Sequence, residues 1–281
     1  MKLAGKFLSA ALFLAAATVQ AVPVTFSGAG TNAAAIQPTV DAFRAALGTL
    51  NPNVVGSLGS GRREINWDGV PDAFSAPNNL PGNFFNANSP RGVLLSTPGT
   101  GLQLSANAGI APVEFGNIDP TYPGLFAPFS AQRLFTALGS NIVDVNFFVP
   151  GTATSAFTNA FGAVFSDVDV AGSTSLEFFD GNNLSLGMFL AQAAQGNETF
   201  SFLGVQFSQG AVVSRVRITS GNQILASGNT ANDLVVMDDF IYGEPVARGT
   251  VPEPASLPLL VLAAAAALLA AAGRRRRQPT V

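Results

Sequence analysis

The stretch VVSRVRIT, residues 212–219, decides the fold class. In an extended chain, successive side chains point to opposite faces, so positions 212, 216 and 218 place two valines and an isoleucine on one face. Arg215 and Arg217 lie on the other face. This alternation predicts a half-buried β-strand with one face in a core and the other in water.

Similar runs, alternating or continuously apolar, occur along the rest of the chain and are separated by Gly, Pro, Asn and Asp. They are Val93–Ser96, Gly101–Ala106, Ile142–Val149, Phe161–Val170, Ser175–Phe179, Thr199–Phe207 and Leu234–Tyr242. Asp180-Gly181, between two of these runs, is typical of a hairpin turn. Many short strands predict an all-β fold, a single β-sandwich or jelly-roll-like domain whose core draws on the 23 phenylalanines.

One short helix is expected near the start of this domain. Pro38 suits a first helical turn, Val40, Phe43 and Leu47 follow at helical spacing, and Gly48 suits the end. The segment 31–90 is rich in Asn, Pro and Gly, and we expect this helix plus long loops at one end of the domain.

Composition excludes several kinds of chemistry. The 281 residues include no histidine and no cysteine, so an imidazole base, a thiolate nucleophile and a Cys/His metal site are ruled out. Residues 22–250 carry eight arginines, no lysine and sixteen acidic residues, a net charge of −8. Because phosphate binding needs a positive field, we expect no nucleic-acid partner; divalent cations or neutral glycans fit better.

The first 21 residues have the pattern of a secretory signal peptide. Lys2 and Lys6 precede an apolar run over residues 7–17, and Val19-Gln20-Ala21 suits signal peptidase cleavage after Ala21. The alternative is a retained transmembrane helix, but the run is shorter than the roughly 20 apolar residues that a bilayer requires. We therefore expect export.

The end of the chain combines three features in a fixed order. Val251-Pro252-Glu253-Pro254 is followed by an apolar Leu/Ala/Val stretch over residues 257–272. Four arginines then follow, Arg274, Arg275, Arg276 and Arg277. The apolar stretch predicts a transmembrane helix with the arginines in the cytoplasm, which places the preceding chain outside the inner membrane.

This arrangement resembles the PEP-CTERM sorting signal of Gram-negative bacteria. The resemblance covers residues 251–281 and implies that a membrane-embedded exosortase recognises Pro252-Glu253-Pro254 and releases or transfers the protein. A permanent tail anchor after a proline-rich stalk is the alternative. The implied organisation is a signal peptide (1–21), an extracellular domain (22–243), a linker (244–250) and a sorting signal (251–281).

Two pairs of aspartates are candidate metal ligands. Asp167 and Asp169 share one face of a predicted strand, and Asp238-Asp239 lies within the last one. A carboxylate among apolar neighbours needs a partner, and Ca²⁺ is the hard cation that oxygen ligands suit. The alternative is that these aspartates cap turns through backbone N–H groups.

Trp67, the single tryptophan, lies in a polar segment and has two interpretations. As a loop residue it would stack on a sugar ring while Asn66 and Asp68 bind hydroxyl groups. As a structural residue it would fill the core, with arginine–carboxylate pairs fixing the loop. Glu64, Asp68 and Asp72 would be the carboxylates of a polysaccharide hydrolase.

The sequence therefore predicts an exported, non-enzymatic protein. It would begin as an inner-membrane-anchored precursor and end at the cell surface or in the extracellular, exopolysaccharide-rich matrix of a biofilm. Signal peptidase, exosortase and exopolysaccharide are the expected partners, and no cofactor is expected apart from structural Ca²⁺. The alternatives are a calcium-dependent carbohydrate-binding module and, less favoured, a polysaccharide hydrolase.

Overall fold

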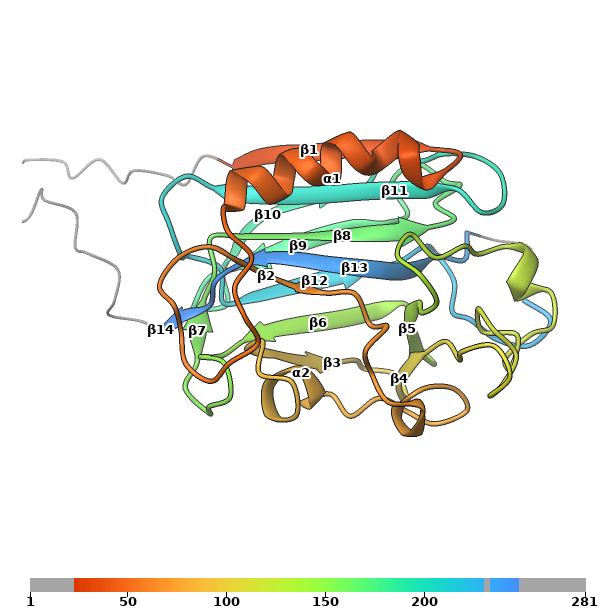
Figure 1. Cartoon of the computed structure of the whole chain (residues 1–281). Coiled ribbons are helices and arrows are strands. Elements are labelled where there is room, and N and C mark those ends of the chain that lie inside the picture. The colour runs from red at the N-terminus through yellow and green to blue at the C-terminus, as the bar shows by residue number, and fades with distance from the viewer. Residues whose placement is uncertain (1–22, 230–232, 248–281) are drawn as a thin grey trace, which may run out of the picture.

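Two antiparallel sheets pack face to face in the computed structural model, which describes residues 23–229 and 233–247 (Figure 1). The seven-stranded sheet has the order β1-β11-β8-β13-β5-β4, and β2 also pairs with β13. Its strands are β1 (Pro23–Gly30), β2 (Arg62–Ile65), β4 (Gly101–Leu104), β5 (Phe135–Leu138), β8 (Ala160–Ser166), β11 (Phe200–Phe207) and β13 (Val236–Gly243).

The five-stranded sheet has the order β10-β9-β12-β6-β3. Its strands are β3 (Val93–Ser96), β6 (Ile142–Phe147), β9 (Ser175–Phe179), β10 (Ser185–Leu190) and β12 (Arg215–Thr219). A small ribbon joins β7 (Ala156–Phe157) to β14 (Val246–Ala247), and the short helices are α2 (Phe84–Ala87) and the 3₁₀ turns Asp72–Phe74 and Tyr122–Gly124. The predicted all-β sandwich is confirmed at this level.

The main core fills the space between the two sheets. From the five-stranded sheet it takes residues such as Val145 and Ile218, and from the seven-stranded sheet Phe161 and Phe240. The alternation is confirmed over residues 215–219, because Val216 and Ile218 are fully buried while Arg215 and Arg217 pair with Asp144 on the outer face. It does not extend to the start of the predicted strand, because β12 begins at Arg215, Val212 is only partly buried and Val213 is fully buried.

Helix α1 (Ala33–Leu47) covers the outer face of the seven-stranded sheet (Figure 1). Its buried residues Ile36, Val40, Phe43 and Leu47 follow helical spacing, and it ends at Gly48 as expected. Its start is earlier than expected: Asn32 caps the helix, the run of alanines after it favours helix, and Pro38 lies inside rather than in the first turn.

The eight predicted strands are all present, and two coincide fully with their predicted bounds, Val93–Ser96 and Ser175–Phe179. The Asp180-Gly181 hairpin is confirmed, since Asp180 Oδ1 accepts hydrogen bonds from the backbone N–H groups of Asn182 and Leu184 between β9 and β10. The expectation for residues 31–90 is corrected, because β2 within that segment belongs to the seven-stranded sheet.

The predicted linker at 244–250 begins too early. Glu244 is 4% exposed and pairs with Arg63, and Val246 and Ala247 form β14. The domain therefore extends at least to Ala247.

Several predicted segments lie outside the described residues: the signal peptide, the cleavage site at Ala21, the sorting motif, the apolar stretch and the arginine cluster. Within residues 23–229 and 233–247, no helix has both the length and the apolar character needed to cross a bilayer.

Candidate functional site

Asp238 and Asp239 occupy a β-bulge in β13. Met237 lies opposite Phe165 and Phe240 lies opposite Ala163, so two residues of β13 face one residue of β8. The bulge lets both Met237 and Phe240 reach the core between the sheets. It thereby places two consecutive carboxylates together in a polar cluster, which strict alternation would not do.

Ser130 lies at the centre of this cluster, in contact with three carboxylates. Its Oγ lies 2.8 Å from Asp239 Oδ1, 3.2 Å from Asp238 Oδ1 and 3.4 Å from Asp68 Oδ2. A hydroxyl group donates one hydrogen bond, so it cannot satisfy three carboxylates alone. The arrangement therefore favours a proton held among the carboxyl groups.

The pKa values of this cluster follow from its burial. Burial raises the pKa of Asp238 well above its usual range, and repulsion from Asp239 adds to this increase. Hydrogen bonds from the N–H groups of Phe129 and Ser130 oppose it in part. Burial also raises the pKa of Asp239, although the Ser130 hydroxyl and Arg44 oppose the shift. The pKa of Asp68 is raised as well, chiefly by burial.

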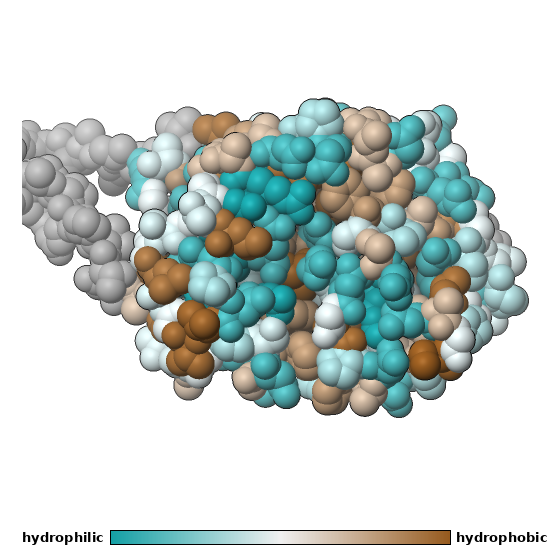
Figure 2. Space-filling view, viewed as in Figure 1, coloured by the Kyte–Doolittle hydropathy of each residue, from teal (hydrophilic) through white to brown (hydrophobic). Residues whose placement is uncertain are grey.

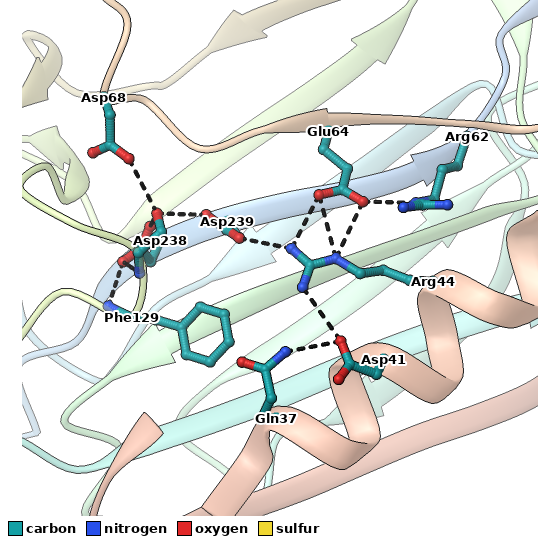
Figure 3. A network of polar contacts seen from close by, with 10 residues as sticks. Gln37, Asp41, Arg44, Arg62, Glu64, Asp68, Phe129, Asp238 and Asp239 are labelled. Carbon is teal, nitrogen blue, oxygen red and sulfur yellow. Dashed lines mark hydrogen bonds and ion pairs between the residues drawn. The ribbon is translucent and has the colours of Figure 1, made fainter. Parts of the chain in front are cut away.

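Arg44, in the last turn of α1, connects the helix to this cluster (Figure 3). Its Nη2 lies 3.0 Å from both Glu64 Oε2 on β2 and Asp239 Oδ2 on β13, and its Nε lies 3.1 Å from Glu64 Oε1. Arg62 binds the same Glu64 carboxylate at 2.6 Å. The network fixes the end of α1 against two strands.

Asp167 and Asp169 belong to a different cluster, completed by Asp233. The N–H of Asp169 donates to Asp233 Oδ1 at 2.7 Å, the N–H of Gly196 donates to Asp169 Oδ1 at 2.8 Å, and Ser173 Oγ donates to Asp233 Oδ2. Asp167 is 5% exposed, has φ of +72°, and its Oδ1 has no hydrogen-bond partner. Burial, with repulsion from Asp169 and Asp233, raises the pKa of Asp167 to about 7.

The structure separates the four predicted calcium ligands into these two clusters. The oxygens of Asp238 and Asp239 accept hydrogen bonds from Phe129, Ser130 and Arg44. In the described ranges 23–229 and 233–247, no three carboxylates are positioned to hold a common metal ion. The capping alternative fits Asp169 and Asp238, which accept backbone N–H groups.

Trp67 is a core residue, so its interpretation as an exposed sugar-stacking platform is wrong. It is 1% exposed, stacks on Phe135 at 4.3 Å between ring centroids, and meets the edges of Phe85 and Phe240. The structural alternative is the one observed. Asn66 beside it is exposed, whereas Asp68 belongs to the Ser130 cluster.

The three carboxylates of the hydrolase hypothesis are all engaged in contacts within the protein. Glu64 pairs with Arg44 and Arg62, Asp72 pairs with Arg133 at 2.5 Å, and Asp68 accepts the backbone N–H of Arg133 at 3.1 Å. Each therefore has a role in holding the loop to the sheet.

Two neighbouring cavities open beside this network. The first, of about 370 Å³, is lined by Arg44, Asn51, Glu64, Ser130 and Asp239 among others. The second, of about 390 Å³, has aromatic walls, and Asn66 and Arg91 line both. On the face that carries α1, Figure 2 shows a mainly polar surface broken by apolar patches.

Sequence reasoning missed Ser130, Arg44, Asp233 and Arg91. Ser130 and Asp233 lie in irregular segments far along the chain from the aspartates they contact, so no spacing pattern marks them. The bulge could have been predicted from the sequence, because two adjacent aspartates inside an apolar strand interrupt its alternation.

Comparisons with known proteins assign the chain to no family. No protein-family model matches the chain, and no curated protein matches it.

Proposed function

We propose that this chain is an exported, non-catalytic protein of the cell surface or the exopolysaccharide matrix, processed through a PEP-CTERM signal. The observation that carries the proposal is the ordered tail: Val251-Pro252-Glu253-Pro254, an apolar stretch, then Arg274 to Arg277. The fold supports it, because a two-sheet sandwich with a large apolar core needs no disulfide for stability, and the chain has no cysteine.

The charges of the domain support a structural role for most of its ionisable groups. Carboxylates that a hydrolase would use are engaged by arginines or by backbone N–H groups, as in the Glu64–Arg44 pair. We further propose a jelly-roll-like connectivity, because the chain crosses between the two sheets at β8–β9, β10–β11, β11–β12 and β12–β13.

Intact-mass measurement tests this proposal. Protein recovered from the native host would be fractionated into inner membrane, cell surface and medium, and the surface or medium form should lack residues 1–21 and the tail from about Pro252 onward. The variant Pro254→Ala should retain the tail, whereas Pro258→Ala, outside the motif, should be processed normally. Exclusive recovery of tail-bearing protein in the inner membrane of the unmutated strain would overturn the proposal and favour a permanent anchor.

A second candidate function is calcium-dependent carbohydrate binding. The observation that favours it is Asp167, whose buried carboxylate has an unpartnered oxygen beside Asp169 and Asp233. A bound cation would remove the unfavourable charge, but the three carboxylates would have to converge further than they do here. Millimolar Ca²⁺ should raise the Tm of the wild type but not of Asp167→Asn, and an unchanged wild-type Tm would dispose of the idea.

A further inference from the structure

Arg91 differs from the other arginines that the structure describes. Six of the seven in residues 23–229 and 233–247 form ion pairs with Asp or Glu, namely Arg44, Arg62, Arg63, Arg133, Arg215 and Arg217. Arg91 forms no ion pair with any described residue. Partial burial of an unpaired guanidinium is costly, because the cation loses hydration without gaining a counter-charge.

The guanidinium of Arg91 is nevertheless held in place. It lies over the ring of Phe85 at 5.2 Å from the centroid, and Nη1 donates to Ser89 Oγ. Nε has no hydrogen-bond partner, and Nη2 makes no hydrogen bond to any described residue. Burial, aided by the like charge of Arg63, lowers the pKa of Arg91, as expected for a cation that lacks a counter-charge.

Arg91 lines the aromatic-walled cavity of about 390 Å³. This volume lies within the range of small-molecule sites, about 300–1,000 Å³. Apolar walls come from Trp67, Val70, Pro71, Phe74, Phe84 and Phe85. Of the four aromatic residues, Phe74 is the one that is partly exposed, so part of it is available for contact with a ligand.

The polar side chains at this cavity include Asn66, Asn88 and Arg91, and the indole of Trp67 lies in its wall. The indole Nε1 of Trp67 and Nε of Arg91 have no hydrogen-bond acceptor among the residues that the structure describes. Asn66 and Asn88 are exposed at the cavity, and their side-chain amides make no hydrogen bond to any described residue. The two unpaired N–H atoms are themselves buried, so the groups able to reach a ligand are the amides of Asn66 and Asn88 and Nη2 of Arg91. All three can donate hydrogen bonds, so the cavity suits a ligand that carries acceptor oxygens.

We propose that this cavity binds a sugar residue that carries one anionic group. The anionic group, a carboxylate, lies on the guanidinium of Arg91, where Nη2 is free to donate. The sugar ring packs against Phe74, and the amides of Asn66 and Asn88 bind its hydroxyl groups. The inference deepens the proposed matrix function by naming a ligand class, and it rests on that function for the biological source of the ligand.

The charge of the domain limits which anionic glycans fit. The net charge of −8 over residues 22–250 repels a densely charged polymer at long range. At physiological ionic strength, screening over about 8 Å leaves the local attraction of Arg91 for a single carboxylate largely intact. A terminal or sparsely placed acidic sugar is therefore favoured over a polyanion.

Calorimetric titration of the full chain, purified from exporting cells, tests the proposal. The probes are methyl glucuronide and methyl glucoside, which differ in one carboxylate, and inorganic phosphate. Methyl glucuronide should bind at least about tenfold more tightly than methyl glucoside, and Arg91→Gln should abolish this preference. Arg217→Gln removes the same charge from the five-stranded sheet, far along the chain, and should leave the preference unchanged.

A second variant guards against a folding defect in Arg91→Gln. Asn88→Asp adds a negative charge at an exposed position that lines the cavity. It should weaken methyl glucuronide binding more than methyl glucoside binding, because the added charge repels only the ligand that carries a carboxylate. Equal affinity for the two sugars, no binding of either, or an unaltered preference in both variants would overturn the proposal. Displacement of methyl glucuronide by an equal concentration of phosphate would also overturn it, since the cavity would then be a simple anion site. Because purified protein is titrated, a failure of sorting in the host does not affect this result.

Discussion

At the scale of single residues, Asp167 shows how burial turns an ordinary carboxylate into a source of pH dependence. Its pKa of about 7 in the folded protein exceeds the usual value near 4, so the folded state holds a proton that the unfolded state has released. Below about pH 4 Asp167 is protonated in both states, and its contribution to the stability of the fold is fully present. This contribution is lost as the pH rises through about 7.

Asp167→Asn should therefore stabilise the protein at pH 7 in the presence of EDTA, by about 1–3 kcal/mol. It should also flatten the dependence of stability on pH between about 4 and 7. Urea unfolding at several pH values measures both effects. Asp41→Asn, on the exposed face of α1, should leave the pH profile near that of the wild type, and an unchanged profile in Asp167→Asn would contradict the assignment.

Arg63 and Glu244 form the most deeply buried ion pair of the described residues. Arg63 Nε and Nη2 lie 2.7 and 2.8 Å from the two oxygens of Glu244, and Nη1 donates to the carbonyls of Pro52 and Pro90. The side chains are 0% and 1% exposed. The pair holds the loop after α1 against the end of the sandwich.

Glu244→Gln should cost about 3–5 kcal/mol in unfolding free energy, because it leaves a buried guanidinium without its counter-charge. Arg217→Gln also breaks an ion pair, with Asp144, but its side chain is 42% exposed, so we expect a loss below about 1 kcal/mol. Denaturant unfolding of the two variants provides the comparison. Similar losses in both would show that burial of the pair is not what matters.

At the scale of elements, the contact between α1 and the seven-stranded sheet depends on two glycines. Gly162 on β8 and Gly204 on β11 lie directly opposite each other beneath the ring of Phe43. A Cβ added at Gly204 would lie 2.9 Å from Phe43 Cδ2, closer than carbon atoms approach. Glycine inside these strands therefore marks the place where the helix approaches the sheet.

Gly204→Ala should destabilise the protein by about 1–3 kcal/mol, because the well-packed Phe43 must move. Gly124→Ala is the matched control, since a Cβ there meets no atom within 4 Å. Thermal unfolding of both variants measures the difference. If Gly204→Ala is as stable as the control, the helix is free to shift on the sheet.

The elements also show what sequence patterns could and could not predict. Strands with a buried apolar face, such as β12, can be predicted from the sequence because burial of one face imposes alternation. Strand β2 cannot be predicted in this way, because its sequence RREI buries the charged Arg63, whose partner Glu244 lies 181 residues away. β10 is an edge strand with exposed Met188 and Leu190, and its apolar pattern does not distinguish an inner face.

The candidate sites follow the same logic. The adjacency of Asp238 and Asp239 was visible in the sequence, but their partner Ser130 was not, because the contact forms through folding of an irregular segment. The polar neighbours of Trp67 in the sequence are compatible with both a loop and a core position. Its stacking against Phe135 shows that it is a core residue. Long-range pairing, which local patterns do not encode, determines these sites.

At the scale of the whole molecule, the start of β1 and the ribbon strand β14 lie at the same end of the sandwich (Figure 1). The predicted signal peptide precedes β1 and the predicted sorting tail follows β14. Both processing events would therefore act at one end of the domain.

The predicted orientation of the precursor can be tested by cysteine labelling, because the chain has no native cysteine. Asn182→Cys places a thiol in the exposed β9–β10 turn, and Thr280→Cys places one beyond the arginine cluster. Positive charge at one end of an apolar stretch keeps that end in the cytoplasm. In cells without exosortase and with a permeabilised outer membrane, a membrane-impermeant maleimide should therefore label Cys at 182 but not at 280.

Lysis of the inner membrane should then expose position 280 to the same reagent, which shows that the tail is present and reactive. Replacing Arg274 to Arg277 with glutamine removes the charge asymmetry, so a fraction of the chains should become labelled at 280 in intact cells. Labelling at 280 before lysis in the chain with all four arginines would contradict the predicted orientation. It would also remove the basis for sorting, because recognition of Pro252-Glu253-Pro254 on the outer side requires the arginines to remain inside.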